Sequence, residues 1–238
     1  MARGRPDYMI PVGGITPESF ITYSQVSPPI LMFDDFESTT FKWISANGTI
    51  SRDTTSATGG TPSTVFEGDA CMKLVTDVES YNEARRWIPF REALYNIGIS
   101  FVFCAVTQLN YLNSNIDQQL IAFKIYDGTN YKHIIITYNF QSGNWYYMED
   151  KAETSTLIGK AHVDPSYYNY VKLVVDLNTN YCKYLIVNAT RLDMSDVPLF
   201  VSADTSTQTF YLWIRITAAA GKTATIYIDN YKVTYNEP

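Results

Sequence analysis

The segment Tyr170–Asn188 reads YVKLVVDLNTNYCKYLIVN and shows a pattern that recurs along the chain. Two apolar runs of strand length flank the short polar stretch Asn178-Thr179-Asn180. Residues of this kind tolerate the backbone geometry of a tight turn between strands. We therefore predict that the two runs form adjacent antiparallel strands.

From Ile30 onward, short apolar or alternating runs follow one another about every ten residues, with turn residues between them. The 238 residues include 19 Tyr, 12 Phe and 4 Trp, and aromatic side chains favour the half-buried surface of a pleated sheet. This combination predicts an all-β domain of two antiparallel sheets over residues 30–238. Residues 1–29 are predicted to be an extended arm, because they contain five prolines and Gly13-Gly14.

Charge and cysteine content exclude several classes of protein. The net charge of −6 argues against nucleic acid as a main partner, because binding phosphates needs a basic surface. No signal peptide is expected after Met1, and no run approaches the about 18 apolar residues of a membrane span. Cys71, Cys104 and Cys182 lie in apolar runs without CxxC spacing, which predicts buried free thiols rather than disulfides or a zinc site.

The sequence predicts no catalytic residues. His133 and His162 have no second histidine or glutamate at metal-binding spacing, and no serine lies in a GxSxG motif. Asp35 and Glu37 would share one face of a continuing strand, as a paired-carboxylate glycosidase requires. An acid near a strand end is more often solvated or caps a turn, so we expect no catalytic pair there.

A structural calcium ion is the alternative use of the acidic segments. Calcium prefers several carboxylate and carbonyl oxygens. The segments DDFE (34–37) and EGD (67–69) would supply them together with Asp229, provided that the first and last strands lie side by side.

Two aromatic clusters exceed what alternation can bury in one sandwich. They are NWYYM (144–148) and DPSYYNY (164–170). Aromatic side chains stack on sugar rings, bury area at protein interfaces and pack in cores, and all three uses are open here. The candidate ligand or interface aromatics are Trp145, Tyr146, Tyr147, Tyr167 and Tyr168.

The order of features from Asp34 to Tyr235 resembles the concanavalin A-like lectin/glucanase superfamily, including its laminin-G-like domains and carbohydrate-binding modules. The matching segments are FDDFES (33–38) followed by Trp43, EGDACMKLV (67–75), the hairpin at 170–188, and IYIDNYKVT (226–234). This resemblance implies a jelly roll of two sheets. It also implies that Glu37 and Asp229, with Asp69 as a third ligand, hold a structural calcium ion; no other cofactor is expected.

The enzymes of the superfamily carry motifs that this chain lacks. The ExDxxE strand of the glucanases does not occur. YNEARRW (81–87) matches the RxExR strand of jelly-roll polysaccharide lyases only in part, and Ile121 stands where their QxH motif has histidine. The resemblance therefore implies a fold without a transferable activity.

Three functions follow from these features. The first is a non-catalytic assembly protein of a virion, such as a capsid decoration or tail-associated protein, whose arm contacts other copies or neighbouring structural proteins. The second is a carbohydrate-binding module or lectin with a surface glycan as partner, and the third is a polysaccharide-degrading enzyme. The expected location is the virion, with an extracellular location as the alternative, and no nucleic acid or membrane is expected as partner.

Overall fold

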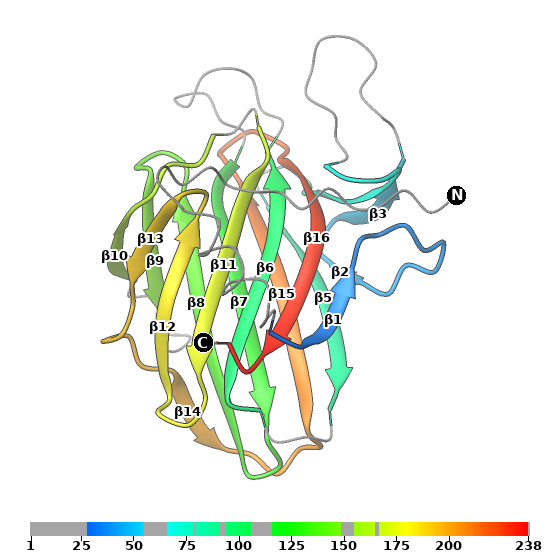
Figure 1. Ribbon diagram of the computed structural model, residues 1–238. Helices are drawn as coiled ribbons and strands as arrows, with labels where there is room; N and C mark the ends of the chain where they lie inside the picture. The colour runs from blue at the N-terminus through cyan, green and yellow to red at the C-terminus, as the bar shows by residue number, and fades with distance from the viewer. Residues whose placement is uncertain are drawn as a thin grey trace, which may run out of the picture.

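The chain forms two β-sheets that pack face to face (Figure 1). A computed structural model describes residues 28–54, 66–78, 80–90, 94–105, 116–148, 155–164 and 167–237. Their sixteen strands pair antiparallel, and none of the described residues is helical. The predicted all-β jelly-roll sandwich of two sheets is confirmed.

Sheet A lies in front in Figure 1 and has the order β13-β12-β11-β6-β16-β4-β3, with β1 also paired to β16. Its strands are β1 (Ile30–Asp34), β3 (Thr49–Asp53), β4 (Cys71–Val75), β6 (Asn96–Cys104), β11 (Asn169–Asp176), β12 (Tyr181–Val187), β13 (Thr190–Asp193) and β16 (Thr225–Tyr235).

Sheet B lies behind it and has the order β10-β9-β8-β7-β15-β5-β2, with β14 also paired to β8. Its strands are β2 (Ile44–Ala46), β5 (Tyr81–Pro89), β7 (Ile116–Tyr126), β8 (Asn130–Asn139), β9 (Asn144–Met148), β10 (Thr156–Lys160), β14 (Phe200–Ala203) and β15 (Thr209–Ala218).

The predicted hairpin is present as β11 and β12. Val171 pairs with Val187 and Leu173 with Leu185, and all four side chains are buried between the sheets. Asn180 closes the turn with φ 61°, a left-handed conformation that asparagine tolerates better than most residues. Local sequence alone thus accounts for this part of sheet A.

β16 changes partner along one of its edges. Thr225–Ile228 pairs with β4, whereas the residues from Tyr231 to Thr234 pair with β1. The ladder to β6 on the other edge is irregular between Asp229 and Lys232, and Asn230 has φ 50°. Asp229 therefore lies where β16 changes partner from β4 to β1, a position that we call the break in β16, and the backbone of a loop reaches its side chain there.

The predicted N-terminal arm, the predicted free cysteines and the expected lack of a membrane span can be compared with the structure. Residues 1–27 of the predicted arm lie outside the described residues, while the carbonyl of Pro29 accepts the N–H of Tyr235 at 3.0 Å. The three cysteines are free and buried, as predicted. Among the residues that the structure describes, no helix is long and apolar enough to cross a membrane.

Asn82 connects the two sheets at one edge of the sandwich. It is buried on β5 of sheet B, and its Nδ2 donates to the carbonyls of Thr49 at 2.8 Å and Val75 at 2.9 Å in sheet A. Its Oδ1 accepts the hydroxyl of Ser45 on β2. One amide therefore links two backbone carbonyls of sheet A to a side-chain hydroxyl of sheet B.

Asn82→Ala is expected to lower the free energy of unfolding by about 1–3 kcal/mol, because the partly buried carbonyls of Thr49 and Val75 lose their donor. Urea denaturation measures this change. Gln141→Ala, in the exposed turn before β9, is the control and should change it by less than about 0.5 kcal/mol. Equal midpoints for both variants would contradict the role of Asn82.

Candidate functional site

The outer face of sheet B carries the strongest candidate site. On β15, Phe210, Leu212, Ile214 and Ile216 point into the core and are fully buried. Successive side chains of a strand point to opposite faces, so Tyr211, Trp213 and Arg215 point away from the core. On β5 the registered partners Trp87, Arg85 and Glu83 lie on the same outer face.

Three aromatic side chains form what we call the aromatic ladder: Trp87, Tyr211 and Trp213. The ring centroids of Trp87 and Tyr211 are 4.8 Å apart, and those of Tyr211 and Trp213 are 5.0 Å apart. Trp87 is 48% exposed, whereas Trp213 is 8% exposed. Trp213 and Tyr211 pack with Ala122, Ile135 and Met148 outside the main core, so the ladder rests on a small apolar cluster of its own.

Next to the ladder lies the arginine–glutamate triad: Glu83, Arg85 and Arg215. Glu83 is 3% exposed; its Oε2 accepts Nε of Arg85 at 2.7 Å and its Oε1 accepts Nε of Arg215 at 2.6 Å. The Nη2 atoms of both arginines also pair with this carboxylate. Partial burial lowers the pKa of Arg85, but the hydrogen bond and charge of Glu83 outweigh this effect and raise it above the ordinary value.

A second aromatic group continues the same face at the end of β8 that pairs with β14. The ring of Tyr131 stacks on His133 at 5.7 Å, and Phe200 of β14 lies 4.9 Å from His133. Nζ of Lys124 lies 4.7 Å from the Tyr131 ring. His133 is only 2% exposed, so it fills space between these rings rather than lying open to solvent.

The three acidic segments of the calcium prediction do meet, at the break in β16. Oδ2 of Asp229 accepts the backbone N–H groups of Phe66 and Glu67, both at 3.1 Å. Oε1 of Glu37 accepts those of Asp69 at 2.8 Å and Ala70 at 3.0 Å. We call Glu37, Asp229 and the backbone of residues 66–70 the loop clasp.

The loop clasp restricts the residue type at position 68 and contributes to the pKa of Asp229. Gly68 has φ 79°, and a Cβ there would lie 2.2 Å from Oε1 of Glu37, so only glycine fits. Burial raises the pKa of Asp229 to about 7; the backbone hydrogen bonds from Glu67, Asn230 and Phe66 lower it, and the charge of Glu37 raises it further. The side chain of Asp69 takes no part in these bonds.

The donors around the clasp differ from what a cation requires. Calcium needs several oxygen ligands, whereas backbone N–H groups approach both carboxylates here. The described residues include no cluster of three or more acidic, histidine or cysteine side chains arranged for a metal. With these N–H donors, the clasp does not fit a calcium cage. Calcium binding by Glu37, Asp69 and Asp229 stays a prediction.

No family model and no curated protein sequence matches the chain. A carbohydrate esterase of the Shiga toxin-encoding bacteriophage phi24B matches its structure with a TM-score of 0.56 at 13% identity, over 89% of this chain and 100% of that chain. Arcelin-5, a lectin-like defence protein of Phaseolus vulgaris, matches with a TM-score of 0.54 at 9% identity, over 87% and 98%. Lectin UEA-II, in complex with galactose, gives 0.51 at 8% identity, over 87% and 100%.

The chain has the concanavalin A-like lectin fold. Identities of this size establish the shared fold and transfer no activity. The resemblance expected from the four sequence segments is confirmed at that level.

Within this lectin fold, the predicted aromatics of β9 divide between two faces. Trp145 is fully buried, and its Nε1 donates to the carbonyl of Ala161 at 3.1 Å. This corrects its assignment as a contact residue, since its register pairs it with the core residue Tyr138. Tyr147 also packs against the core, whereas Tyr146 pairs with Thr137 and lies on the outer face.

The other two predicted aromatics lie in the segment before β11. Tyr167 is 64% exposed. Tyr168 packs edge-on against Phe66 at 5.1 Å, which brings it next to the loop clasp rather than the aromatic ladder. Trp145, Tyr146, Tyr147, Tyr167 and Tyr168 thus do not form one surface.

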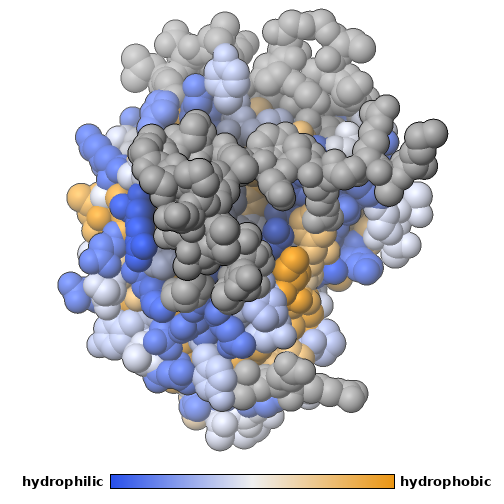
Figure 2. Space-filling model, viewed as in Figure 1, coloured by the Kyte–Doolittle hydropathy of each residue, from blue (hydrophilic) through white to orange (hydrophobic). Residues whose placement is uncertain are grey.

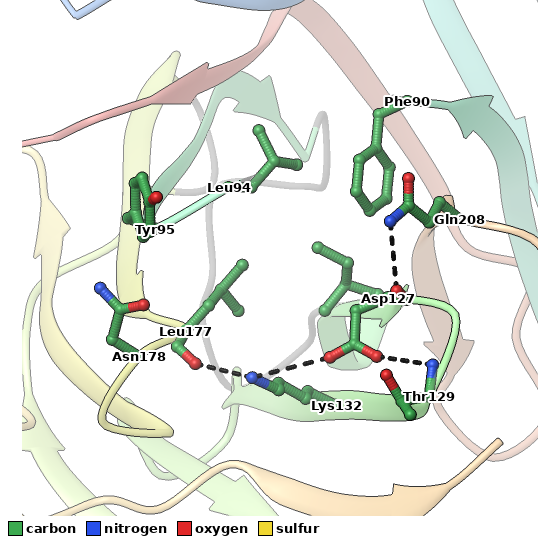
Figure 3. A pocket seen from close by; sticks show the side chains of 10 residues that line it. Phe90, Leu94, Tyr95, Asp127, Thr129, Lys132, Leu177, Asn178 and Gln208 are labelled. Carbon is green, nitrogen blue, oxygen red and sulfur yellow. Dashed lines mark hydrogen bonds and ion pairs between the residues drawn. The ribbon is translucent and has the colours of Figure 1, made fainter. Parts of the chain in front are cut away.

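A cavity of about 340 Å³ opens between the sheets at one end of the sandwich (Figure 3). Its polar groups bond to one another: Nζ of Lys132 donates to the carbonyl of Leu177 at 2.7 Å and lies 3.9 Å from Oδ2 of Asp127, whose carbonyl accepts Nε2 of Gln208. These bonds hold the turns that close this end of the sandwich. The lining residues are Phe90, Leu94, Tyr95, Ile125, Asp127, Thr129, Lys132, Leu177, Asn178 and Gln208.

Sequence reasoning missed the aromatic ladder and both arginines of the triad. The available signal was the alternation in YLWIR (211–215), where every second residue is aromatic or charged, and in ARRW (84–87). The pairing of β15 with β5 joins residues 132 positions apart, such as Glu83 and Arg215, and this register is not visible in either segment alone.

Glu37→Ala is expected to lower the free energy of unfolding by about 1–2 kcal/mol, because the N–H groups of Asp69 and Ala70 lose their acceptor. Asp196→Ala removes an exposed carboxylate from a turn outside the clasp and serves as the control. Thermal unfolding in excess EGTA and in excess calcium then tests the metal. The wild-type protein is expected to stay folded in EGTA. If calcium raised the melting temperature of the wild type and Glu37→Ala abolished this rise, a calcium site would be established. Equal stability of the two variants would contradict the clasp.

Proposed function

We propose that the chain is a carbohydrate-binding protein that binds glycan on the outer face of sheet B. The observation that carries this proposal is the aromatic ladder, a run of rings on two paired strands that is exposed at Trp87, partly exposed at Tyr211 and supported by the buried Trp213. Flat aromatic rings offer a large apolar surface to the C–H face of a sugar, and the polar edge of Tyr offers a hydrogen bond. Strands hold such rings more rigidly than loops do.

The shared fold supports the same proposal. The structural neighbours include a lectin in complex with galactose and a lectin-like defence protein. Those names describe the neighbours. In this chain, the aromatic ladder is the feature that supports glycan binding. Binding is therefore the function that the geometry and the fold favour together, ahead of the assembly role predicted first.

The proposal includes no catalytic step. Hydrolysis of a glycosidic bond uses two carboxyl groups on either side of the bond. Among the described strand residues of this face, Glu83 is the one carboxylate, and both of its oxygens are held by Arg85 and Arg215. This arrangement favours a positioning role for Glu83 over acid or base chemistry.

An assembly role in a virion remains a second proposal. Its main support was the Pro-rich arm, of which residues 1–27 lie outside the described residues. Contact with other copies, with neighbouring structural proteins, and a virion or extracellular location stay predictions. A phage origin would be compatible with glycan binding by the same sheet.

Trp87→Ala and Tyr211→Ala are each expected to weaken glycan binding by about five- to thirtyfold, because each removes a stacking surface worth about 1–2 kcal/mol. A glycan array identifies ligands, and isothermal titration calorimetry with the best of them measures the dissociation constant. Tyr181→Ala removes a ring that is 44% exposed on sheet A and should leave binding unchanged. An array without hits, or equal losses in all three variants, would refute the proposal.

A further inference from the structure

The outer face of sheet B has the opposite charge to the whole protein. Its described strand residues include the cations Arg85, Lys124, Lys160 and Arg215 and the single anion Glu83, whereas the chain carries a net charge of −6. Figure 2 shows the hydropathy of the opposite side of the sandwich, where a hydrophobic strip lies over β1 and the adjacent part of β16 among hydrophilic residues. A local positive surface on an acidic protein attracts anions.

The surplus charge next to the aromatic ladder comes from the arginine–glutamate triad. Hydrogen bonds from Ser206 lower the pKa of Asp204, in the loop after β14, and the charge of Lys124 contributes to the same shift. Lys124 and Asp204 therefore offset each other at the far end of the face. Lys160 lies across the sheet on β10. The two arginines and one glutamate of the triad leave a net positive charge beside Trp213.

Glu83 fixes both arginines without using all of their donors. It engages the Nε and Nη2 groups of each guanidinium. A guanidinium has five N–H donors, so the edge formed by its two Nη groups stays available for another acid. The side chains of Arg85 and Arg215 are 34% and 36% exposed, so that edge can meet a ligand from solvent.

The position of Arg215 is fixed from a second side. Its Cζ lies 4.4 Å from the centroid of the Tyr81 ring, which is a cation–π contact. Tyr81 and the buried carboxylate of Glu83 therefore hold this guanidinium before any ligand binds. Groups that are held in place lose little side-chain entropy on binding.

The triad and the ladder lie side by side on the same two strands. Tyr211 pairs with Trp87, and two residues further along the strands Trp213 pairs with Arg85. Two residues of a strand span about 7 Å. A sugar ring stacked on Trp87 and Tyr211 therefore has its substituents, or its neighbouring sugar, within reach of the guanidinium groups.

We propose that the glycan bound by sheet B is acidic, with a carboxylate or sulfate group that pairs with Arg85 and Arg215 while a sugar ring stacks on the aromatic ladder. This inference rests on the proposed function and names the class of its ligand. Carboxylate and sulfate groups each present two oxygens that can accept hydrogen bonds from the two Nη groups of one guanidinium.

The test compares ligands that share a backbone and differ in charge. The probes are polygalacturonate and its fully methyl-esterified form, dextran sulfate and dextran, and a single-stranded oligothymidylate. The wild-type protein is expected to bind at least one acidic glycan about tenfold or more tightly than its neutral counterpart. This affinity should fall as sodium chloride rises from about 50 mM to about 500 mM.

Arg85→Gln and Arg215→Gln are expected to reduce the affinity for the acidic glycan by about tenfold and that for any neutral glycan by less than about twofold. Arg191→Gln removes an exposed arginine from sheet A and is the matched control for charge. Arg215→Lys keeps the charge but loses the bidentate edge, so an intermediate loss is expected. Melting temperatures show whether each variant is folded, and the wild-type comparison does not depend on any variant.

The outcomes separate the inference from the proposed function. Equal affinity for neutral and acidic forms, with a loss on Trp87→Ala, would overturn the acidic ligand and leave glycan binding intact. No binding of any glycan would overturn both. Tighter binding of oligothymidylate than of every glycan would overturn both in favour of a nucleic acid partner.

Discussion

The alternation of side chains along β15 is the constraint on which the candidate site depends. Because the core requires Phe210, Leu212, Ile214 and Ile216 on one side, the strand must present Tyr211, Trp213 and Arg215 on the other. A slip of one residue in register would bury an arginine and expose these four large apolar side chains. The stability of the sandwich therefore also fixes the position of the aromatic ladder and the triad.

The acidic groups of the chain have different roles according to their surroundings. Asp229 and Glu37 accept backbone N–H groups and hold residues 66–70 against the break in β16. Glu83 is buried like Asp229 but meets two guanidinium groups, so it positions cations at the surface. A buried carboxylate is costly without such partners, and in each case the partners account for its presence.

The sequence predicted the features that depend on neighbouring residues. The hairpin of β11 and β12 follows from two apolar runs around a polar turn, and the sheet class follows from the repetition of such runs. The predicted contact residue Trp145 lies in the core because strand alternation has two possible phases, and NWYYM has aromatics in both. The resemblance to the concanavalin A-like superfamily predicted that Glu37 and Asp229 lie close together. It did not predict that the backbone N–H groups of residues 66–70 bind both carboxylates.

The residues that the sequence did not reveal share one property, which is long-range register. Glu83 and Arg215 are separated by 132 positions and meet because β5 and β15 pair over their full length. Neither YNEARRW nor YLWIR contains information on that pairing. The aromatic side chains on the outer face of sheet B centre on β5 and β15, and Tyr146 is the one predicted aromatic that lies on this face.

Hydroxyl-radical footprinting with an acidic oligosaccharide would test most directly that sheet B is the ligand face, because it reports the solvent exposure of individual aromatic side chains. The account predicts that ligand protects Trp87 and Tyr211 from oxidation and leaves Tyr181 on sheet A and Tyr95 at the end cavity unchanged. Protection of Tyr95 or Tyr181 without protection of Trp87 would contradict it.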